Sequence, residues 1–214
     1  TLGPGAYYVQ AEAECGSVRS DVYTVDADRE DPDFPSFAAV GYTIERADYQ
    51  YDPTEEFNFP CVVDTRDHPV ENAFGSYRYY LFYAPHNAPA GLCVAGSDSL
   101  NGSWTEYGGN PVISNDWKPN YSVNHVSSPH VIWNDTEGLW FMYFHGENAV
   151  TRYATSDDLI NWTYGGVCVK ATDFSPAGTD CSYARVFEYE VPGLGNKYIM
   201  TTMLHETVNR IFWA

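Results

Sequence analysis

Short runs of apolar and aromatic residues recur along the chain, and Gly, Pro, Asn and Asp separate them. The runs at 79–83 and 140–144 are examples, and both fall within the usual length of a strand, about four to eight residues. Val, Ile, Phe, Tyr and Trp dominate these runs, as expected for pleated strands. No segment repeats its apolar residues at a convincing helical spacing. The pattern therefore predicts an all-β protein.

Two segments, 80–109 and 140–166, are versions of one longer pattern. Each has an aromatic strand, a second strand that ends in Ala-x-Ser-Asp, a turn and a Trp, and a short strand that opens on Pro precedes each. The pattern thus describes four strands in succession. Repetition on this scale is typical of stacked units, and a four-stranded antiparallel unit is the blade of a β-propeller.

We expect three such units, the last of which ends within its third strand. The predicted blades are residues 60–114, 125–170 and 181–214. Residues 1–56 form an N-terminal segment and connector of the same domain, so that residues 57–214 make an incomplete propeller. Propellers usually close with about four to eight blades, and an open ring exposes unpaired strand edges. We therefore expect the natural protein to continue beyond Ala214.

The Pro-opened strands, the aromatic second strands such as 79–83 and the Ala-x-Ser-Asp…Trp turns resemble those of the five-bladed propeller glycosidases, the group around glycoside hydrolase family 43 and its relatives. The stretch 125–187 is similar to uncharacterised secreted propellers of carbohydrate-degrading clusters. The resemblance implies a five-bladed scaffold and a secreted enzyme that cleaves glycosidic bonds of an extracellular polysaccharide or oligosaccharide.

Family 43 enzymes carry a base, a pKa-tuning Asp and a general acid Glu where the inner strands open, because hydrolysis needs a pair of carboxyl groups. This chain departs from that pattern. Its three openings read Phe-Pro-Cys at 59–61, Ser-Pro-His at 128–130 and Tyr-Ala-Arg at 183–185, and none contains a carboxylate. His130 stands where the family would have its tuning Asp. Function is expected to depend on the residue at this varying position.

The candidate catalytic residues are His125, His130, His145, Tyr183 and Arg185. His is the usual general base near neutral pH, and Tyr can give a proton to a leaving oxygen. Arg binds carboxylates through a two-pronged fork. A structural role stays open for several of them: His145, for example, could cap the end of its strand by hydrogen bonding.

Two alternatives to hydrolysis also remain open. The first is a polysaccharide lyase acting by β-elimination on a uronate, since propeller lyases resemble this chain in having two His about twenty residues apart, as His125 and His145 are. Arg185 would then bind the carboxylate, while His and Tyr move the protons. The second is a non-catalytic extracellular module that binds glycans or has a structural role.

Four further residues are candidates for substrate binding. Asp64 and Glu188 follow the openings of their strands by three residues, and His86 is expected at the rim of the pocket, where blade tops converge. Arg152 belongs to the stretch that resembles the secreted propellers. A structural ion pair between Arg185 and Glu188 is the competing interpretation.

The net charge of −18 makes nucleic acids and anionic membranes poor partners, since phosphate binding needs clustered Lys and Arg. No apolar run approaches the roughly 18 residues that span a bilayer. No loop has the ligand spacing of a calcium site, so no catalytic metal is expected. The acidity leaves room for a structural divalent cation such as calcium. The expected partner is a carbohydrate, and the oligomeric state stays open.

Cysteines and glycosylation sequons bear on the location of the protein. The five cysteines are Cys15, Cys61, Cys93, Cys168 and Cys181. In a secreted protein some of these should form disulfides, and the absence of Cys-x-x-Cys argues against a zinc or redox motif. The four Asn-x-Ser/Thr sequons are at Asn101, Asn120, Asn134 and Asn161. Together they support a secreted, glycosylated eukaryotic protein.

Overall fold

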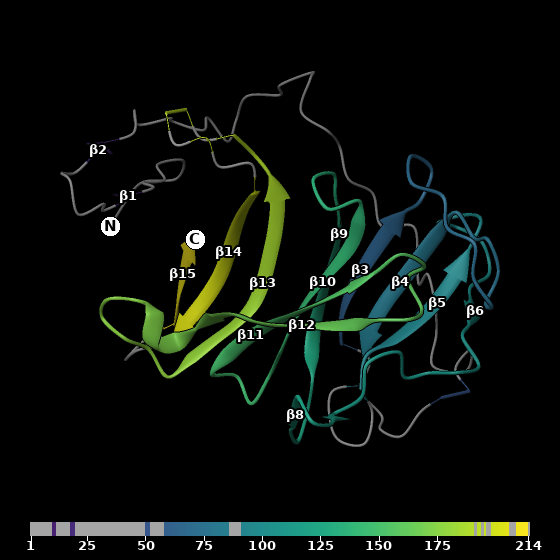
Figure 1. Cartoon of the computed structure of the whole chain (residues 1–214), viewed down its shortest axis with the longest axis horizontal. Helices are drawn as coiled ribbons and strands as arrows, with labels where there is room; N and C mark the ends of the chain where they lie inside the picture. Colours follow the sequence, from purple (N-terminus) through teal and green to yellow (C-terminus); the bar gives the residue numbers. More distant parts are fainter. Residues whose placement is uncertain are drawn as a thin grey trace, which may run out of the picture. The chain divides into compact units, whose positions relative to one another are not determined.

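The chain divides into two compact units, Thr1–Gly41 and Tyr42–Ala214 (Figure 1). The computed structural model describes residues 10–11, 18–19, 50–51, 58–85, 91–190, 192–193, 195, 198–205 and 209–213. In the first unit it describes an antiparallel pair of short strands, β1 (Gln10–Ala11) and β2 (Val18–Arg19).

The second unit contains three larger antiparallel sheets, which Figure 1 shows in blue, green and yellow in chain order. The first sheet comprises β3 (Asn58–Asp64), β4 (Tyr79–Ala84), β5 (Cys93–Ser97) and β6 (Thr105–Glu106). The second comprises β9 (Ser127–Asn134), β10 (Leu139–Gly146), β11 (Val150–Ser156) and β12 (Thr163–Lys170). The third comprises β13 (Asp180–Glu188), β14 (Tyr198–His205) and β15 (Asn209–Trp213). In each sheet, strands adjacent in the chain are adjacent in space.

Two smaller elements complete the described part of this unit. Strands β7 (Asp116–Trp117) and β8 (Tyr121–Ser122) form a hairpin before the second sheet, and the 3-10 turn η2 (Ala171–Asp173) follows it. The described residues contain no α-helix, which confirms the all-β prediction. None of their helical segments is long and apolar enough to cross a membrane.

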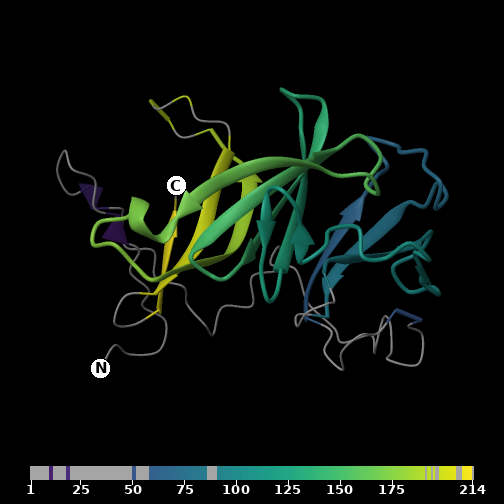
Figure 2. The same ribbon diagram turned by 60° about the horizontal axis from the view of Figure 1, so that its bottom comes forward.

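The first strands of the three sheets, β3, β9 and β13, contact one another in succession, and we call them the inner strands. Each lies at one edge of its sheet, as the innermost strand of a blade does. In both views the long β11–β12 ribbon reaches the third sheet (Figure 2). The first two sheets confirm the predicted four-stranded propeller blades, and the third has three strands in its described residues.

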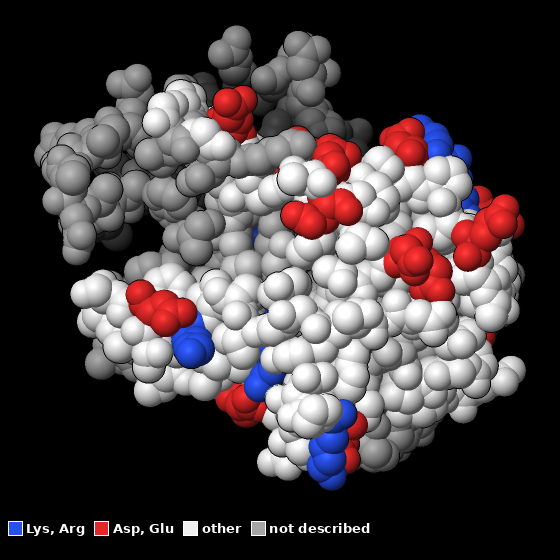
Figure 3. Space-filling model, in the orientation of Figure 1, with Lys and Arg blue, Asp and Glu red and all other residues white. Residues whose placement is uncertain are grey.

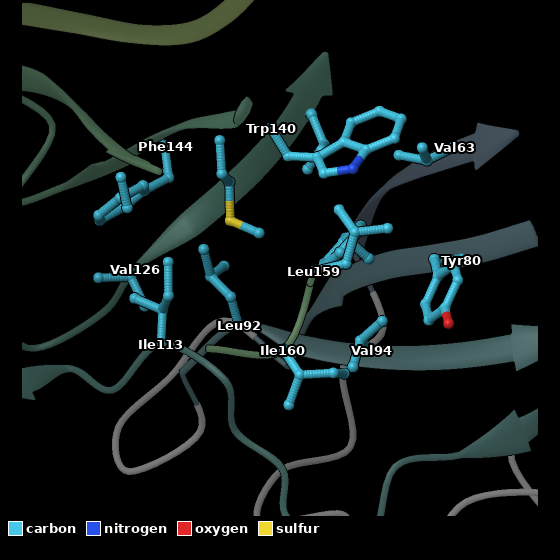
Figure 4. Packing of buried hydrophobic residues seen from close by; sticks show 14 of the residues in the cluster. Val63, Tyr80, Leu92, Val94, Ile113, Val126, Trp140, Phe144, Leu159 and Ile160 are labelled. Carbon is cyan, nitrogen blue, oxygen red and sulfur yellow. The ribbon is translucent and has the colours of Figure 1, made fainter. Parts of the chain in front are cut away.

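The main core lies between the first two sheets, where their inner faces meet (Figure 4). Trp140 and Phe144 of β10 and Leu92, Val94 and Ile113 of the first blade are among its buried side chains. Full burial of an aliphatic or aromatic side chain stabilises a fold by about 1.5–3 kcal/mol. The apolar strand residues seen in the sequence therefore hold neighbouring blades together.

The repeated Ser-Asp turn is structural. In the second blade Ser156 Oγ accepts hydrogen bonds from the backbone N–H groups of Asp158 (3.1 Å) and Leu159 (2.8 Å). In the first blade Ser97 Oγ accepts from the N–H of Ser99 and donates to the carbonyl of Ser103. A Ser hydroxyl thus satisfies the backbone of the turn in both blades.

The repeated Trp packs against the apolar core in both blades. Trp104 is buried against the smaller cluster of the first sheet, and Trp162 lies edge-on to Phe82, with 5.9 Å between the ring centroids. Both positions were expected to be core, and the structure confirms this.

Close packing of an aromatic ring on a glycine makes the first sheet sensitive to one added methyl group. A Cβ at Gly96 would lie 2.2 Å from the ring of Tyr77, which Phe74 and Tyr80 hold in place. We expect Gly96→Ala to lower the free energy of unfolding by about 1–3 kcal/mol, measured by urea denaturation. Gly108→Ala is the control, because nothing lies within 4 Å of its Cβ. Equal stability of the two variants would contradict this account of the packing.

Candidate functional site

Each inner strand begins with the same backbone distortion. Phe59, Ser128 and Tyr183 have φ angles of 55°, 54° and 57°, in the left-handed region that non-glycine residues rarely occupy. The pairing with the second strand of each sheet shifts at these points, so each residue lies in a β-bulge. Such strain costs on the order of 1–3 kcal/mol and is concentrated at functional sites. A functional site is therefore expected at the three openings.

Phe59 and Tyr183, from two of these openings, belong to a row of aromatic rings with His145 and His125. The ring centroids of Phe59 and Tyr183 are 5.2 Å apart, although these residues come from the first and third blades. The Tyr183 ring lies 5.0 Å from that of His145, which in turn lies 5.9 Å from that of His125. We call these four residues the opening cluster. His145 is buried, and the other three are half-buried.

Hydrogen bonds tie the imidazoles of the opening cluster to the protein. The Tyr183 backbone N–H donates to His145 Nδ1 at 3.4 Å. His125 Nε2 lies 3.0 Å from Asn148 Oδ1. The backbone carbonyl of Asn148 accepts a hydrogen bond from the N–H of Cys181 at 2.6 Å, which joins the β10–β11 turn to the start of β13. The structure thus brings together three predicted catalytic residues, His125, His145 and Tyr183.

Arg152 lies beneath the β10–β11 turn and is only 5% exposed. Its guanidinium carbon is 4.9 Å from the centroid of the Tyr121 ring. Nη1 donates to the carbonyl of Gly146 at 3.0 Å, and Nη2 donates to the Glu147 carboxylate. All of these contacts are internal, so they support a role in positioning the turn. A direct contact between Arg152 and substrate stays a prediction.

We call the residues two positions after Phe59, Ser128 and Tyr183 the second layer. They are Cys61, His130 and Arg185. The N–H of Val131 donates to Cys61 Sγ at 3.3 Å, and His130 Nε2 donates to the carbonyl of Val186 at 2.7 Å. Each side chain therefore joins its inner strand to that of the next blade. Arg185, at the third of these positions, donates to the carbonyl of Ala184 at 2.8 Å.

The charge of Arg185 affects the pKa values of the other two residues of the second layer. Burial lowers the pKa of His130 below its usual 6.5, and the positive charge of Arg185 lowers it further, while the hydrogen bond to Val186 opposes the shift. Burial raises the pKa of the Cys61 thiol, an effect that Arg185 partly offsets. The charge of Arg185 thus acts on His130, and both side chains donate hydrogen bonds to backbone carbonyls of β13.

The structure does not bring two of the predicted substrate-binding residues, Asp64 and Glu188, to the opening cluster. Asp64 ends β3, at the other end from Phe59, and forms ion pairs with Arg66 (2.9 Å) and Arg78 (3.2 Å). Hydrogen bonds from these arginines, chiefly Arg78, lower the pKa of its carboxyl group. Glu188 ends β13 in the same way and is exposed. His86 lies outside the described residues.

Two surface hollows in the described part of the chain lie away from the opening cluster. One of about 280 Å³ lies beside the far end of β3, where Tyr77, Arg78 and Asp98 contribute to its lining. The other, of about 270 Å³, lies between the second and third sheets and is lined by Tyr143 and Met200 among others. Acidic side chains are spread over the face seen in Figure 3 and form no single patch.

The predicted disulfides do not form among the four cysteines that the structure describes. Cys61, Cys93, Cys168 and Cys181 are free thiols, and Cys15 lies outside the described residues. Cys61 and Cys93 lie on β3 and β5, with β4 between them. Two strand spacings amount to about 10 Å, which is beyond the reach of a disulfide. Cys168 and Cys181 lie on different sheets.

No group of three or more His, Cys, Asp or Glu in the described ranges could hold a metal ion. Among the sequons, Asn101, Asn120 and Asn161 are exposed. Asn134 is half-buried, and its Oδ1 accepts hydrogen bonds from two backbone N–H groups of the following turn.

The family model for the glycosyl hydrolases family 32 N-terminal domain matches residues 62–195. The chain belongs to this family. The family 32 match covers all of the second blade, most of the first and the opening of the third. It confirms the expected likeness to propeller glycosidases and identifies family 32 within that group.

Individual proteins are similar to parts of this chain in sequence or in fold. Levanase from Bacillus subtilis (strain 168) is 35% identical over 71 residues, which are 33% of this chain and 10% of levanase. A fructofuranosidase from Schwanniomyces occidentalis has a similar fold, with a TM-score of 0.53 and 18% identity over 72% of this chain and 31% of the other. An α-L-arabinofuranosidase from Clostridium thermocellum has a TM-score of 0.50 and 20% identity over 72% of this chain and 45% of the other. The chain thus spans less than half the length of these proteins.

Sequence reasoning missed several residues in and around the opening cluster. Phe59 and Ser128 precede the opening Pro of their strands, and the repeat already marked that position as equivalent to Tyr183. The prediction favoured the residue after the Pro, which the structure places in the second layer. Asn148 had no such signal, because its role depends on a contact with His125 across 23 residues of chain.

The buried imidazole of His130 predicts a pH dependence of stability. Its pKa is lower in the folded than in the unfolded protein, so the unfolded state binds a proton first as the pH falls. The free energy of unfolding should therefore fall from about pH 7 to about pH 5 more steeply in the wild type than in His130→Gln. Urea denaturation at several pH values measures this difference. Parallel curves for the two proteins would contradict it.

Proposed function

We propose that the protein is a carbohydrate-active enzyme of the glycoside hydrolase type, whose glycan binds at the opening cluster and is cleaved there. The contacts of the opening cluster support this most directly, because the strained residues Phe59 and Tyr183 of the first and third blades meet there beside His145 of the second. Membership of family 32 agrees with it. The similarity to levanase suggests a fructose polymer as the substrate class.

The opening cluster has the chemistry for holding a sugar and moving protons. Aromatic rings such as Phe59 and Tyr183 stack against the apolar faces of sugar rings. An imidazole within reach of the scissile oxygen can act as general acid or base. Glu147 follows His145 by two residues and supplies a carboxylate beside the cluster, although it is bound to Arg152. Hydrolysis through a carboxyl pair needs a second such group.

A specific observation also favours β-elimination as a second candidate. His125, His145 and Tyr183 lie in one row, as a base and an acid acting on neighbouring atoms would. In that reaction the base takes the C5 proton of a uronate and the C4–O bond breaks. The acid protonates the leaving oxygen while the C4–C5 double bond forms. Arg185, one layer below, is the candidate partner for the carboxylate.

Replacing one imidazole tests the proposed site. In the full-length protein, we expect His125→Ala to lower kcat/KM on levan, inulin or sucrose by about 100-fold, the usual contribution of a general acid or base. His68→Ala is the matched control: His68 is also half-buried, but it stacks on Trp133 beyond the far end of β3, with 4.2 Å between the ring centroids. The control should retain activity within about twofold.

The products distinguish the candidate reactions. Release of free fructose supports hydrolysis, whereas ultraviolet absorbance of an unsaturated uronate from a pectic substrate supports elimination. Glycan binding without either product would indicate a non-catalytic module. Equal activity in His125→Ala and the wild type would exclude the opening cluster as the catalytic site.

We also propose that the protein is secreted and glycosylated, which the exposed sequons support. Asn101 and Asn120 are exposed in turns, whereas the Nδ2 of Asn161 donates to Asp158 Oδ2 at 2.6 Å. We expect N-glycans at Asn101 and Asn120 in protein recovered from the culture medium of its source, detected by peptide mass spectrometry. Unmodified asparagine at both positions would contradict the proposal.

A further inference from the structure

Two consecutive left-handed residues form the turn between β10 and β11. Glu147 and Asn148 have φ angles of 52° and 55°. Neither is glycine, so the conformation is strained at both positions, although Asn adopts it more readily than most residues. A turn of this kind can be made with glycine at no steric cost. Asn in place of Gly at position 148 therefore indicates that its side chain has a role.

The contacts of Asn148 indicate that role. Its backbone carbonyl accepts a hydrogen bond from Cys181 N–H at 2.6 Å, while its side-chain Oδ1 lies 3.0 Å from His125 Nε2. The backbone of this residue thus holds the third blade, and its side chain holds an imidazole of the opening cluster. The two functions use different atoms and can be separated by substitution.

The contact with His125 determines which ring nitrogen carries the proton. An amide oxygen only accepts hydrogen bonds, so His125 Nε2 must be the donor. In a neutral imidazole the other nitrogen, Nδ1, is then the basic one. The hydrogen bond also restricts rotation of the ring relative to His145 and Tyr183. This is the relation between a general base and the group that orients it.

Arg152 holds the turn from below. Its guanidinium binds the carbonyl of Gly146 and the carboxylate of Glu147, the two residues that precede Asn148. The Tyr121 ring covers the guanidinium carbon at 4.9 Å. The position of the Asn148 amide is therefore determined by a buried charge and an aromatic ring, and it does not depend on a mobile surface loop.

We propose that Asn148 is a positioning residue, which orients His125 in the opening cluster and keeps it as the Nε2–H tautomer. The left-handed turn and its buried Arg152 serve to present the Asn148 amide to the imidazole. The consequence for catalysis rests on the function proposed above, whereas the consequence for the tautomer does not.

The decisive variant is Asn148→Gly. Glycine keeps the left-handed backbone and the hydrogen bond from Cys181, and it removes only the amide that contacts His125. In ¹⁵N-histidine-labelled protein near pH 8, we expect the wild type to show His125 as the Nε2–H form. We expect Asn148→Gly to show a mixture of both tautomers, and Asn148→Asp to restore the Nε2–H form because a carboxylate is also an acceptor.

The control is Asn134→Gly, which removes a turn-capping amide at the far end of β9. It should leave the tautomer of His125 unchanged. On an active substrate, Asn148→Gly should lower kcat by roughly 10- to 100-fold with a smaller change in KM, as expected when a reacting group is misplaced. Asn148→Asp should recover part of that loss.

The outcomes separate the two proposals. An Nε2–H signal from His125 that is the same in the wild type and Asn148→Gly would overturn the positioning role. A changed tautomer in a protein without detectable turnover would support the positioning role and count against the proposed function. A loss of kcat with an unchanged tautomer would also overturn the positioning role, because Asn148 would then affect catalysis in another way.

Discussion

A non-glycine residue in the left-handed region crowds its own side chain against the neighbouring backbone, yet each of the three inner strands begins with one. The bulge interrupts the alternation of side chains along the strand. Phe59 and Tyr183 can therefore meet, although they come from different blades. Two residues later the pairing with the second strand has resumed at Cys61 and Arg185. The contact between Phe59 and Tyr183 and the layer two residues further along both follow from this one distortion.

The second layer has a different role, because it connects neighbouring blades. The inner strand of a blade is at the edge of its sheet, so its outer backbone groups have no partner within that sheet. His130 donates one side-chain hydrogen bond to the next inner strand, and Cys61 Sγ accepts from the N–H of Val131 and donates to its carbonyl. Such bonds are few, and most of the cohesion comes from the apolar core between the sheets. Propeller blades can thus stay distinct sheets and still form one body.

Family membership and local chemistry give different information about this chain. The scaffold is that of the glycosyl hydrolase family 32 N-terminal domain, but a fold supports many reactions and the site decides among them. Here the three openings present aromatic, hydroxyl and imidazole groups where a hydrolase would present carboxylates. The nearby carboxylate of Glu147 is engaged by a buried arginine. The chemistry proposed for the opening cluster therefore rests on His125, His145 and Tyr183.

Much of the scaffold could be predicted from the sequence. The four-strand repeat, the Ser-Asp turns around Ser97 and Ser156 and the core positions of Trp104 and Trp162 depend on local spacing, and one strand or turn is enough to define them. The expected disulfides were wrong for the described cysteines, because spacing along the chain does not say which strands come between two thiols.

The site was only partly predictable. The sequence marked His125, His145 and Tyr183 as candidates, but it favoured the residues after the opening Pro and placed Asp64 with the site. Only the tertiary structure decided that Phe59 meets Tyr183, that Asp64 lies at the opposite end of β3 and that Asn148 orients His125. The physical reason is that strand patterns depend on neighbours along the chain, whereas the site is made by bulges and turns that bring together residues from different blades.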